Sequence, residues 1–308
     1  MSHAGLPNGV LVLINPKAGV SAPLDVVMRS INEHWDHPDS PVSFQFSKNI
    51  ADGQRKVQQA LSNEVKTVIV VGGDGMINSI GAELIHTDVA LGVIPTGSGN
   101  GFARHFGIPL KAESAAAALA KADRVRIDVG RANQRPFFVT CSMAWDAAIV
   151  RTFDKSPVRG VIPYVFAAMF EWFEYKPQPF EAVIDDRDTL RFKDPLLFTL
   201  ANLTQYGGNA RIAPNACPND GLLELVVVER KDAPAVLANL PRLFNGTMDR
   251  VGQVQTRKFS SLRVSRPNPA PIQLDGELVD ADTEVVIDLL PEALTVLVPK
   301  KVALNAAN

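Results

Sequence analysis

The chain has 308 residues, which is enough for two domains that each bury a hydrophobic core. Its formal net charge of −2 gives no global basic field of the kind that nucleic-acid-binding proteins carry, so we expect no nucleic-acid partner. The two cysteines, Cys141 and Cys217, lie far apart without CxxC spacing, which argues against a disulfide framework and predicts reduced thiols in a cytoplasmic protein. We find no signal peptide and no apolar run of about 20 residues, so we expect any membrane contact to be peripheral.

The first third of the sequence alternates between short apolar runs and amphipathic segments. The apolar runs predict strands over residues 10–14, 42–47, 67–71 and 90–94. Helices are predicted over residues 23–35, 51–62, 76–85 and 112–122. Apolar strands that alternate with helices indicate an α/β domain with a Rossmann-like parallel sheet covered by helices on each side. Ligands of such sheets bind beyond the carboxyl ends of the strands, and glycine-rich segments follow the strands here.

From about residue 125 the pattern changes to closely spaced, strand-like segments. They predict a mainly antiparallel β-sandwich as a second domain, interrupted by helical inserts over residues 158–175 and 232–245. The first insert is rich in aromatic residues, which either line a site for acyl chains or belong to the domain core. We expect a nucleotide-binding α/β domain over residues 1–126, a β-rich lipid-substrate domain over 127–290, and a tail over 291–308 that could pack back on the first domain.

The run VIVVGGDGMIN places a carboxylate inside a glycine turn directly after a predicted strand. Glycine lets a ligand approach bare backbone N–H groups, and a helix N-terminus attracts phosphates. Gly72, Gly73 and Gly75 therefore suggest a phosphate loop, in which Asp74 would meet Mg²⁺ or accept a proton from an attacking hydroxyl. The alternative is a tight turn in which Asp74 caps the helix.

A second glycine-rich loop, IPTGSGNGFAR, follows the next predicted strand. Ser98 and Asn100 supply short polar side chains next to Gly97, so the loop is a second candidate for the phosphate cradle. The motif NPKAG, with Asn15 and Gly19, would form its third element. The alternative for the second loop is a flexible connection without a ligand.

The ordered motifs NPKAG, GGDGM and PTGSGNGFAR resemble the diacylglycerol kinase catalytic family, which includes bacterial lipid kinases and sphingosine kinases. The resemblance continues in MAWDAAIV, in YGGNARIAPNACPNDGLLEL and in LDGE, and so spans residues 10 to about 290. It implies a two-domain fold with ATP in the cleft between the domains. The sequence departs from the family at Met76, where the family has threonine, and at the loop from Gly97 to Gly101, which is closer to sphingosine kinases.

The resemblance also implies roles for individual residues. Its nucleotide-binding positions correspond to Asn15, Pro16, Lys17, Ala18, Gly19, Ser47, Gly73, Asp74, Gly75, Met76, Ile77, Asn78, Ser79 and Ser98. The two glycine-rich loops add Gly72, Gly97 and Asn100 to these positions. The proton-accepting acid corresponds to Glu277, beside Asp275, and a structural Mg²⁺ to the side chain of Asp220 with the carbonyls of Cys217 and Leu222.

Phosphoryl transfer requires that the γ-phosphate is held, that its charge is neutralised, and that the acceptor hydroxyl is aligned and deprotonated. Glycine loops with Mg²⁺ meet the first two requirements, and a carboxylate of the second domain, Glu277 or Asp275, would meet the third. The alternative for LDGE is a polar hairpin turn, since Asp-Gly is a strong turn dipeptide, and Asp220-Gly221 has the same alternative.

These observations predict an ATP-dependent lipid kinase that phosphorylates a diacylglycerol-like hydroxyl at a membrane surface. Four alternatives stay open: a sphingoid-base kinase, because of GSGNG; a non-catalytic nucleotide or lipid sensor, because of Met76; and, more remotely, an NAD kinase or an oxidoreductase. An open edge strand could support a homodimer, although nothing in the sequence requires one.

Overall fold

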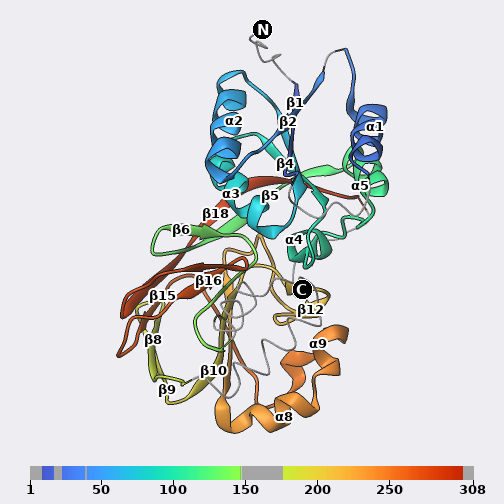
Figure 1. Ribbon diagram of the computed structural model, residues 1–308. Helices are drawn as coiled ribbons and strands as arrows, with labels where there is room; N and C mark the ends of the chain where they lie inside the picture. Colours follow the sequence, from blue (N-terminus) through green and yellow to red (C-terminus); the bar gives the residue numbers. More distant parts are fainter. Residues whose placement is uncertain (1–8, 17–22, 39, 146, 148–175, 301–308) are drawn as a thin grey trace. The chain divides into compact units, whose positions relative to one another are not determined.

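The computed structural model describes residues 9–16, 23–38, 40–145, 147 and 176–300 (Figure 1). The chain forms two compact units. The first extends to Ile127 and takes in the segment that begins at Glu292, and the second runs from Asp128 to Pro291. Outside the described residues lie Lys17, Ala18 and Gly19, the predicted aromatic-rich helix over 158–175, and the end of the chain after Lys300. In the part of the chain that is described, no helix is long and apolar enough to cross a bilayer.

The first unit is built on a parallel sheet with the strand order β2-β1-β3-β4. The strands are β1 (Val10–Ile14), β2 (Val42–Phe46), β3 (Thr67–Gly72) and β4 (Ala90–Pro95). Every residue of β1, β3 and β4 is buried, as expected for strands that helices cover on both faces. The last strand, β18 (Glu284–Val298), extends the sheet, because it pairs in parallel with β4 at Val296.

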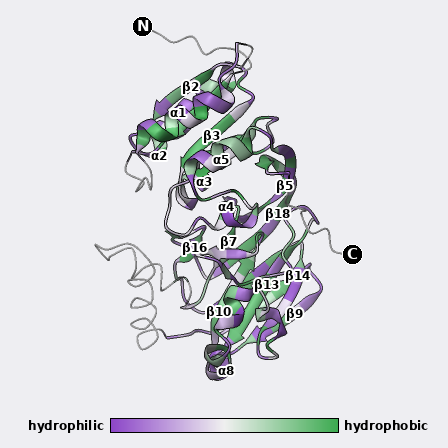
Figure 2. Cartoon of the chain, turned by 90° about the vertical axis from the view of Figure 1, so that its right-hand side faces the viewer, coloured by the Kyte–Doolittle hydropathy of each residue, from purple (hydrophilic) through white to green (hydrophobic). Residues whose placement is uncertain are grey.

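Helices cover both faces of this sheet (Figure 1). On one face α2 (Ile50–Ser62) packs with α3 (Asp74–Gly81), and on the other α1 (Leu24–Trp35) packs with α5 (Ala112–Leu119). A short 3₁₀ turn, Ala82–Leu84, follows α3. In Figure 2, β3 is coloured as hydrophobic, whereas α1 and α2 carry both hydrophobic and hydrophilic residues. Such amphipathic helices bury one face on the sheet and expose the other. This arrangement explains why apolar strand segments alternate with amphipathic helical segments in the sequence.

The second unit is built from antiparallel strands. One sheet has the order β14-β13-β10-β7-β16-β17, and the other contains β18, β15, β8 and β9 in that order, with β5 paired to β18 and β6 paired to β5. The strands of these sheets, apart from β18, are β5 (Asp123–Ala132), β6 (Arg135–Phe137), β7 (Thr140–Ser142), β8 (Phe180–Ile184), β9 (Asp188–Phe192), β10 (Pro195–Ala201), β13 (Leu223–Glu229), β14 (Gln255–Phe259), β15 (Leu262–Ser265), β16 (Ile272–Leu274) and β17 (Glu277–Val279). A two-stranded ribbon, β11 (Gln205–Gly207) and β12 (Ala210–Arg211), and the short helices α8 (Ala233–Ala238) and α9 (Pro241–Asn245) are added to them.

A hydrophobic core joins the two sheets of the second unit. Phe198 of β10 makes edge-to-face contacts with Phe180 of β8 and Phe192 of β9, with ring centroids 5.1 and 5.7 Å apart. The same buried cluster contains Leu225 of β13 and Val264 of β15, so both sheets contribute to it. The two units therefore confirm the predicted fold class: a parallel α/β domain followed by an antiparallel β-sandwich.

The structure contains elements that the sequence did not predict. Strands β9 and β14 end the strand order of their sheets, and their sequences, DTLRF and QTRKF, are too polar to give a clear signal. An edge strand needs to bury less of its surface than a central one, so its pattern is weaker. The segment expected as a loop over residues 94–104 contains the short helix α4 (Gly101–His105).

Candidate functional site

The predicted loop residues of the first unit meet at the carboxyl edge of its parallel sheet. Asn15, Ser47, Gly73 and Thr96 each directly follow the end of one strand. Backbone hydrogen bonds connect neighbouring strand ends: the N–H of Ser47 donates to the Ile14 carbonyl at 2.8 Å, and the N–H of Thr96 donates to the Gly72 carbonyl at 3.0 Å. The edge is therefore a connected surface of backbone groups, which is where ligands of such sheets bind.

The two glycine turns touch each other through their backbones. A Cβ added to Gly97 would lie 2.8 Å from the Cα of Gly73, and one added to Gly73 would lie 3.1 Å from the Cα of Gly97. These glycines are thus required for the close approach of one turn to the other. At Gly72 the neighbour is a side chain and not a backbone, because a Cβ there would come 2.7 Å from Sδ of Met76.

The side chain of Asp74 ties the two turns together. One of its oxygens accepts the N–H of Gly101 at 3.0 Å and the other accepts the N–H of Phe102 at 3.1 Å. These are the first amides of α4, whose own N-cap, Asn100, has no side-chain cap bond. Asp74 therefore caps a helix that lies 27 residues further along the chain. Burial raises the pKa of the Asp74 carboxyl, and the amide donors oppose that shift.

The second turn is stabilised by its own polar residues. The side chain of Asn100, which has a left-handed φ of 52°, accepts the N–H of Gly97 at 3.0 Å and donates to the Gly97 carbonyl at 2.7 Å. Nε of Arg104 donates to the Gly99 carbonyl at 3.1 Å. These bonds fix the conformation of a segment that the sequence alone would allow to be flexible.

Two features of this edge leave hydrogen-bond donors for an anion. Helix α3 begins at Asp74 after Gly73 and has no side-chain cap bond at its N-terminus. Its first two amides, those of Asp74 and Gly75, precede the first hydrogen bond of the helix, which Met76 donates to the Gly73 carbonyl, and they lie at the positive end of its dipole. The hydroxyl of Thr96 is buried and has no hydrogen-bond partner among the described residues. Backbone N–H groups and one hydroxyl thus offer the hydrogen-bond donors that a phosphate requires.

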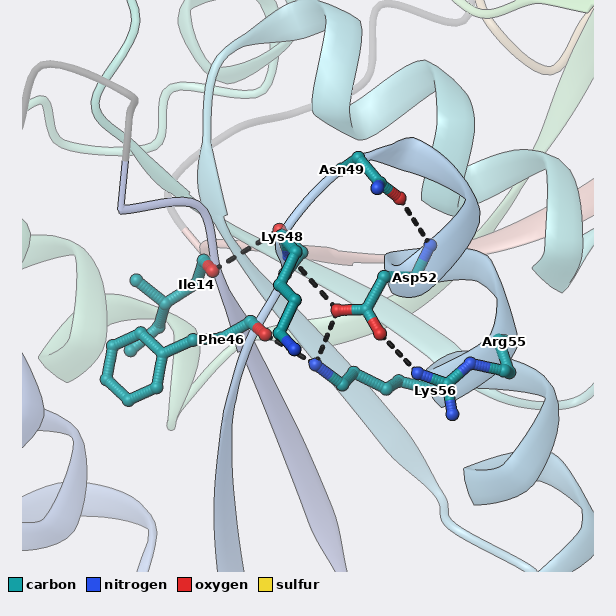
Figure 3. Close-up of polar contacts among 8 residues, drawn as sticks. Ile14, Phe46, Lys48, Asn49, Asp52, Arg55 and Lys56 are labelled. Carbon is teal, nitrogen blue, oxygen red and sulfur yellow. Dashed lines mark hydrogen bonds and ion pairs between the residues drawn. The ribbon is translucent and has the colours of Figure 1, made fainter.

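A charged cluster orders the segment next to Ser47 (Figure 3). Asp52 accepts the N–H of Lys48 at 3.0 Å and the ammonium of Lys56 at 2.6 Å, and it also binds Arg55. The hydrogen bond from Lys56 is the main reason why the pKa of Asp52 lies well below its usual range. Two cations, Arg55 and Lys56, contact one carboxylate, so this corner adds positive charge beside the end of β2. The sequence analysis did not identify this cluster, although the (i, i+4) spacing of Asp52 and Lys56 is a recognisable signal.

In the second unit, the predicted acids lie on a tight hairpin. Asp275 and Gly276 connect β16 to β17 with φ values of 51° and 93°, and Leu274 is opposite Glu277. The polar-turn alternative for LDGE is therefore realised in the backbone. Asp275 is only 7% exposed, whereas Glu277 is exposed.

The Asp275 carboxylate is fully engaged with backbone amides. It accepts three N–H groups in the segment that leads into β7, from Phe138 at 2.7 Å, Val139 at 2.8 Å and Thr140 at 3.0 Å. Its own N–H donates to the Thr140 carbonyl at 2.9 Å. Asp275 thus holds the hairpin that carries Glu277, and Glu277 is the carboxylate that solvent and ligands can reach.

The position at which the resemblance implies a structural Mg²⁺ has a different arrangement. One oxygen of Asp220 accepts the N–H of Leu222 at 3.1 Å, and the other forms an ion pair with Lys258 at 2.6 Å. Cys217 is buried, and its thiol donates to Asn219. Among the described residues, no group of three or more His, Cys, Asp or Glu side chains could hold a metal ion. The ammonium of Lys258 already neutralises the one carboxylate of the implied set, so the residues present do not favour a divalent ion at Asp220.

Two family models match the chain. The diacylglycerol kinase catalytic domain matches residues 9–132, and the YegS C-terminal NAD kinase beta sandwich-like domain matches residues 140–298. The chain is 28% identical over 298 residues to a protein named diacylglycerol kinase from Mycobacterium tuberculosis (strain CDC 1551 / Oshkosh), with 94% of this chain and 95% of that protein covered. It is 29% identical over 256 residues to "Probable lipid kinase YegS-like" from Yersinia pestis (strain Pestoides F), with coverages of 80% and 84%.

Solved structures are similar to both units together. A diacylglycerol kinase from Bacillus anthracis str. Sterne has a TM-score of 0.72 at 20% identity and covers 96% of this chain and 98% of its own. An NAD kinase from Archaeoglobus fulgidus in complex with ATP has a TM-score of 0.53 at 13% identity, with coverages of 95% and 94%. At these identities the likeness supports the fold alone. The two family models confirm the resemblance that the motifs predicted: the chain belongs to the kinases that join a diacylglycerol kinase catalytic domain to a YegS-type C-terminal domain, and it is a phosphotransferase of the lipid-kinase type.

Proposed function

We propose that the protein is an ATP-dependent lipid kinase that transfers the γ-phosphoryl group of ATP to the hydroxyl of a diacylglycerol-like lipid. The observation that supports this most directly is the pair of interlocked glycine turns at the carboxyl edge of the first unit's sheet. The names of the relatives, diacylglycerol kinase and lipid kinase, favour a lipid acceptor.

The phosphates of ATP would be held by backbone N–H groups and a few hydroxyls. The uncapped N-terminus of α3 and the buried, unpartnered hydroxyl of Thr96 fit a group with many acceptor oxygens. Asn15, Ser47 and Ser98 belong to the same predicted binding set. When bound, ATP with its Mg²⁺ supplies the phosphoryl group that is transferred.

Asp74 contributes to this site by positioning the backbone. Both of its oxygens accept amide N–H groups of α4, so they hold the two turns in one arrangement. Phosphoryl transfer depends mainly on positioning and on preorganised charge, so a fixed cradle lowers the barrier more than a mobile one. In this proposal Asp74 is a positioning residue, which revises the metal-binding or proton-accepting role that its place in GGDG first suggested.

Glu277 is the proposed proton acceptor for the lipid hydroxyl. It is exposed, and the neighbouring Asp275 holds its hairpin through three backbone amides. A general base that removes the proton of the attacking hydroxyl typically contributes about 10²–10⁴-fold to the rate. Asp275 supports that role by fixing the turn and does not accept the proton itself.

The proposal is tested by incubating the purified protein with γ-labelled ATP, Mg²⁺ and separate vesicles that contain diacylglycerol, phosphatidylglycerol or sphingosine. We expect labelled product with diacylglycerol-like lipid. Preferential labelling of sphingosine would make the protein a sphingoid-base kinase instead. Tight ATP binding without labelling of any lipid over a range of Mg²⁺ concentrations would contradict the kinase proposal and favour a sensor.

A further inference from the structure

The turn around Asp220 is braced from two sides by carboxylates. Gly221, with a left-handed φ of 73°, donates its N–H to Oδ2 of Asp128 at 2.8 Å. Asp128 is 1% exposed, and its own N–H donates to the Pro218 carbonyl at 2.6 Å. On the other side, Asp220 accepts the N–H of Leu222 at 3.1 Å. The backbone of this turn is thus fixed by two carboxylates.

The cation beside this turn is the ammonium of Lys258. Lys258 belongs to β14 and lies directly opposite Glu224 of β13 in the antiparallel register. Its Nζ lies 2.6 Å from Oδ2 of Asp220, and the two side chains are only 35% and 25% exposed. The sheet register places Lys258 opposite Glu224, and from there its ammonium reaches Asp220, which lies just before β13.

We propose that the Lys258 ammonium replaces the divalent cation that the family resemblance implies at Asp220, so that the second unit is stable without Mg²⁺. An ammonium donates three hydrogen bonds as a compact positive charge, and it needs fewer ligands than Mg²⁺, which requires a near-octahedral set of oxygens. A divalent ion beside Asp220 would also meet the repulsion of an ammonium already in contact with that carboxylate.

This inference concerns the second unit and does not rest on the proposed kinase reaction. It predicts that any Mg²⁺ requirement of the protein comes from the nucleotide and not from the Asp220 turn. Removal of Lys258 leaves Asp220 without its cation, whereas removal of Asp220 leaves Lys258 with Glu224 opposite it.

The test is thermal unfolding of the full-length, nucleotide-free protein in EDTA and in millimolar Mg²⁺ at matched ionic strength. We expect the same midpoint in both conditions for the unaltered protein. Lys258→Met should lower the midpoint in EDTA by a few degrees, whereas Lys231→Met, which removes a more exposed lysine paired with Glu229, should leave it unchanged.

Two results would overturn the inference. One is a saturable rise of the midpoint with Mg²⁺ in the unaltered protein that disappears in Asp220→Asn, because it would show a divalent ion at this turn. The other is a Lys258→Met protein as stable in EDTA as the unaltered one. If Lys258→Met fails to fold, the Mg²⁺ titration of the unaltered protein and of Asp220→Asn still decides the question.

Discussion

Asp74 in the first unit and Asp275 in the second unit occupy similar places: each follows a strand, lies next to a glycine and was predicted to take part in the chemistry. Asp74 accepts two amides at the start of α4, and Asp275 accepts three in the segment that leads into β7. The difference lies in what each one holds. Asp74 joins two glycine turns, whereas Asp275 supports a hairpin that presents a second acid, Glu277, to solvent.

The comparison indicates that an acid in a glycine turn can hold the backbone by accepting N–H groups. Neighbouring groups are then the ones that bind the ligand. Amides occupy both oxygens of each carboxylate, so neither acid can contact a substrate hydroxyl without giving up those hydrogen bonds. The groups left for chemistry are then the uncapped amides of α3 in the first unit and the exposed carboxylate of Glu277 in the second. Four predictions test this assignment.

The largest effect is expected for Glu277→Gln, which removes the proposed proton acceptor and keeps the shape of the side chain. Turnover should fall about 10²–10⁴-fold, with little change in the midpoint of thermal unfolding. Asp280→Asn, an exposed acid three residues away, is the matched control and should retain full activity. A Glu277→Gln protein with normal turnover would remove this residue from the mechanism.

Asp275→Ala should reduce the free energy of unfolding by about 3–5 kcal/mol, because three backbone amides would lose their common buried acceptor. Asp275→Asn, which keeps one acceptor oxygen, should lose less. Urea denaturation of both variants measures the difference. Equal stability of Asp275→Ala and the unaltered protein would mean that these hydrogen bonds do not support the hairpin.

Gly97→Ala should destabilise the first unit by about 1–3 kcal/mol and weaken ATP binding, since the new Cβ would lie 2.8 Å from the Cα of Gly73. The matched control is Gly252→Ala, because no atom lies within 4 Å of a Cβ at that position. ATP titration and urea denaturation are the measurements. Unchanged ATP affinity in Gly97→Ala would mean that ATP binding does not depend on the close packing of the two turns.

The smallest effect is expected for Asp52→Asn in the charged cluster beside Ser47. The pKa of Asp52 is lowered in the folded protein, chiefly by Lys56, so its ionised form stabilises the fold above the unfolded-state pKa of about 3.9. That contribution is lost as the pH falls towards the folded-state pKa. The difference in stability between the unaltered protein and Asp52→Asn should therefore be largest at neutral pH and shrink below about pH 4. A difference that is independent of pH would contradict this origin.

The sequence by itself determined the order of elements and the location of the candidate site. Apolar runs such as VLVLI and TVIVV could only be buried strands, and the amphipathic segments between them could only cover a sheet. Because parallel strands place their carboxyl ends on one edge, the motifs after them had to converge there. The edge strands β9 and β14 were missed because their polar sequences bury little surface.

Only the tertiary structure decided which partners the carboxylates take. Asp74 bonds to amides 27 and 28 residues away, Asp275 to amides 135 to 137 residues away, and Asp220 to an ammonium 38 residues away. A carboxylate accepts hydrogen bonds from whichever donors packing brings within reach, and no local spacing in the sequence encodes that choice. The motifs therefore show where acids and glycines gather, and the packing of distant segments decides which acids hold the backbone and which face a ligand.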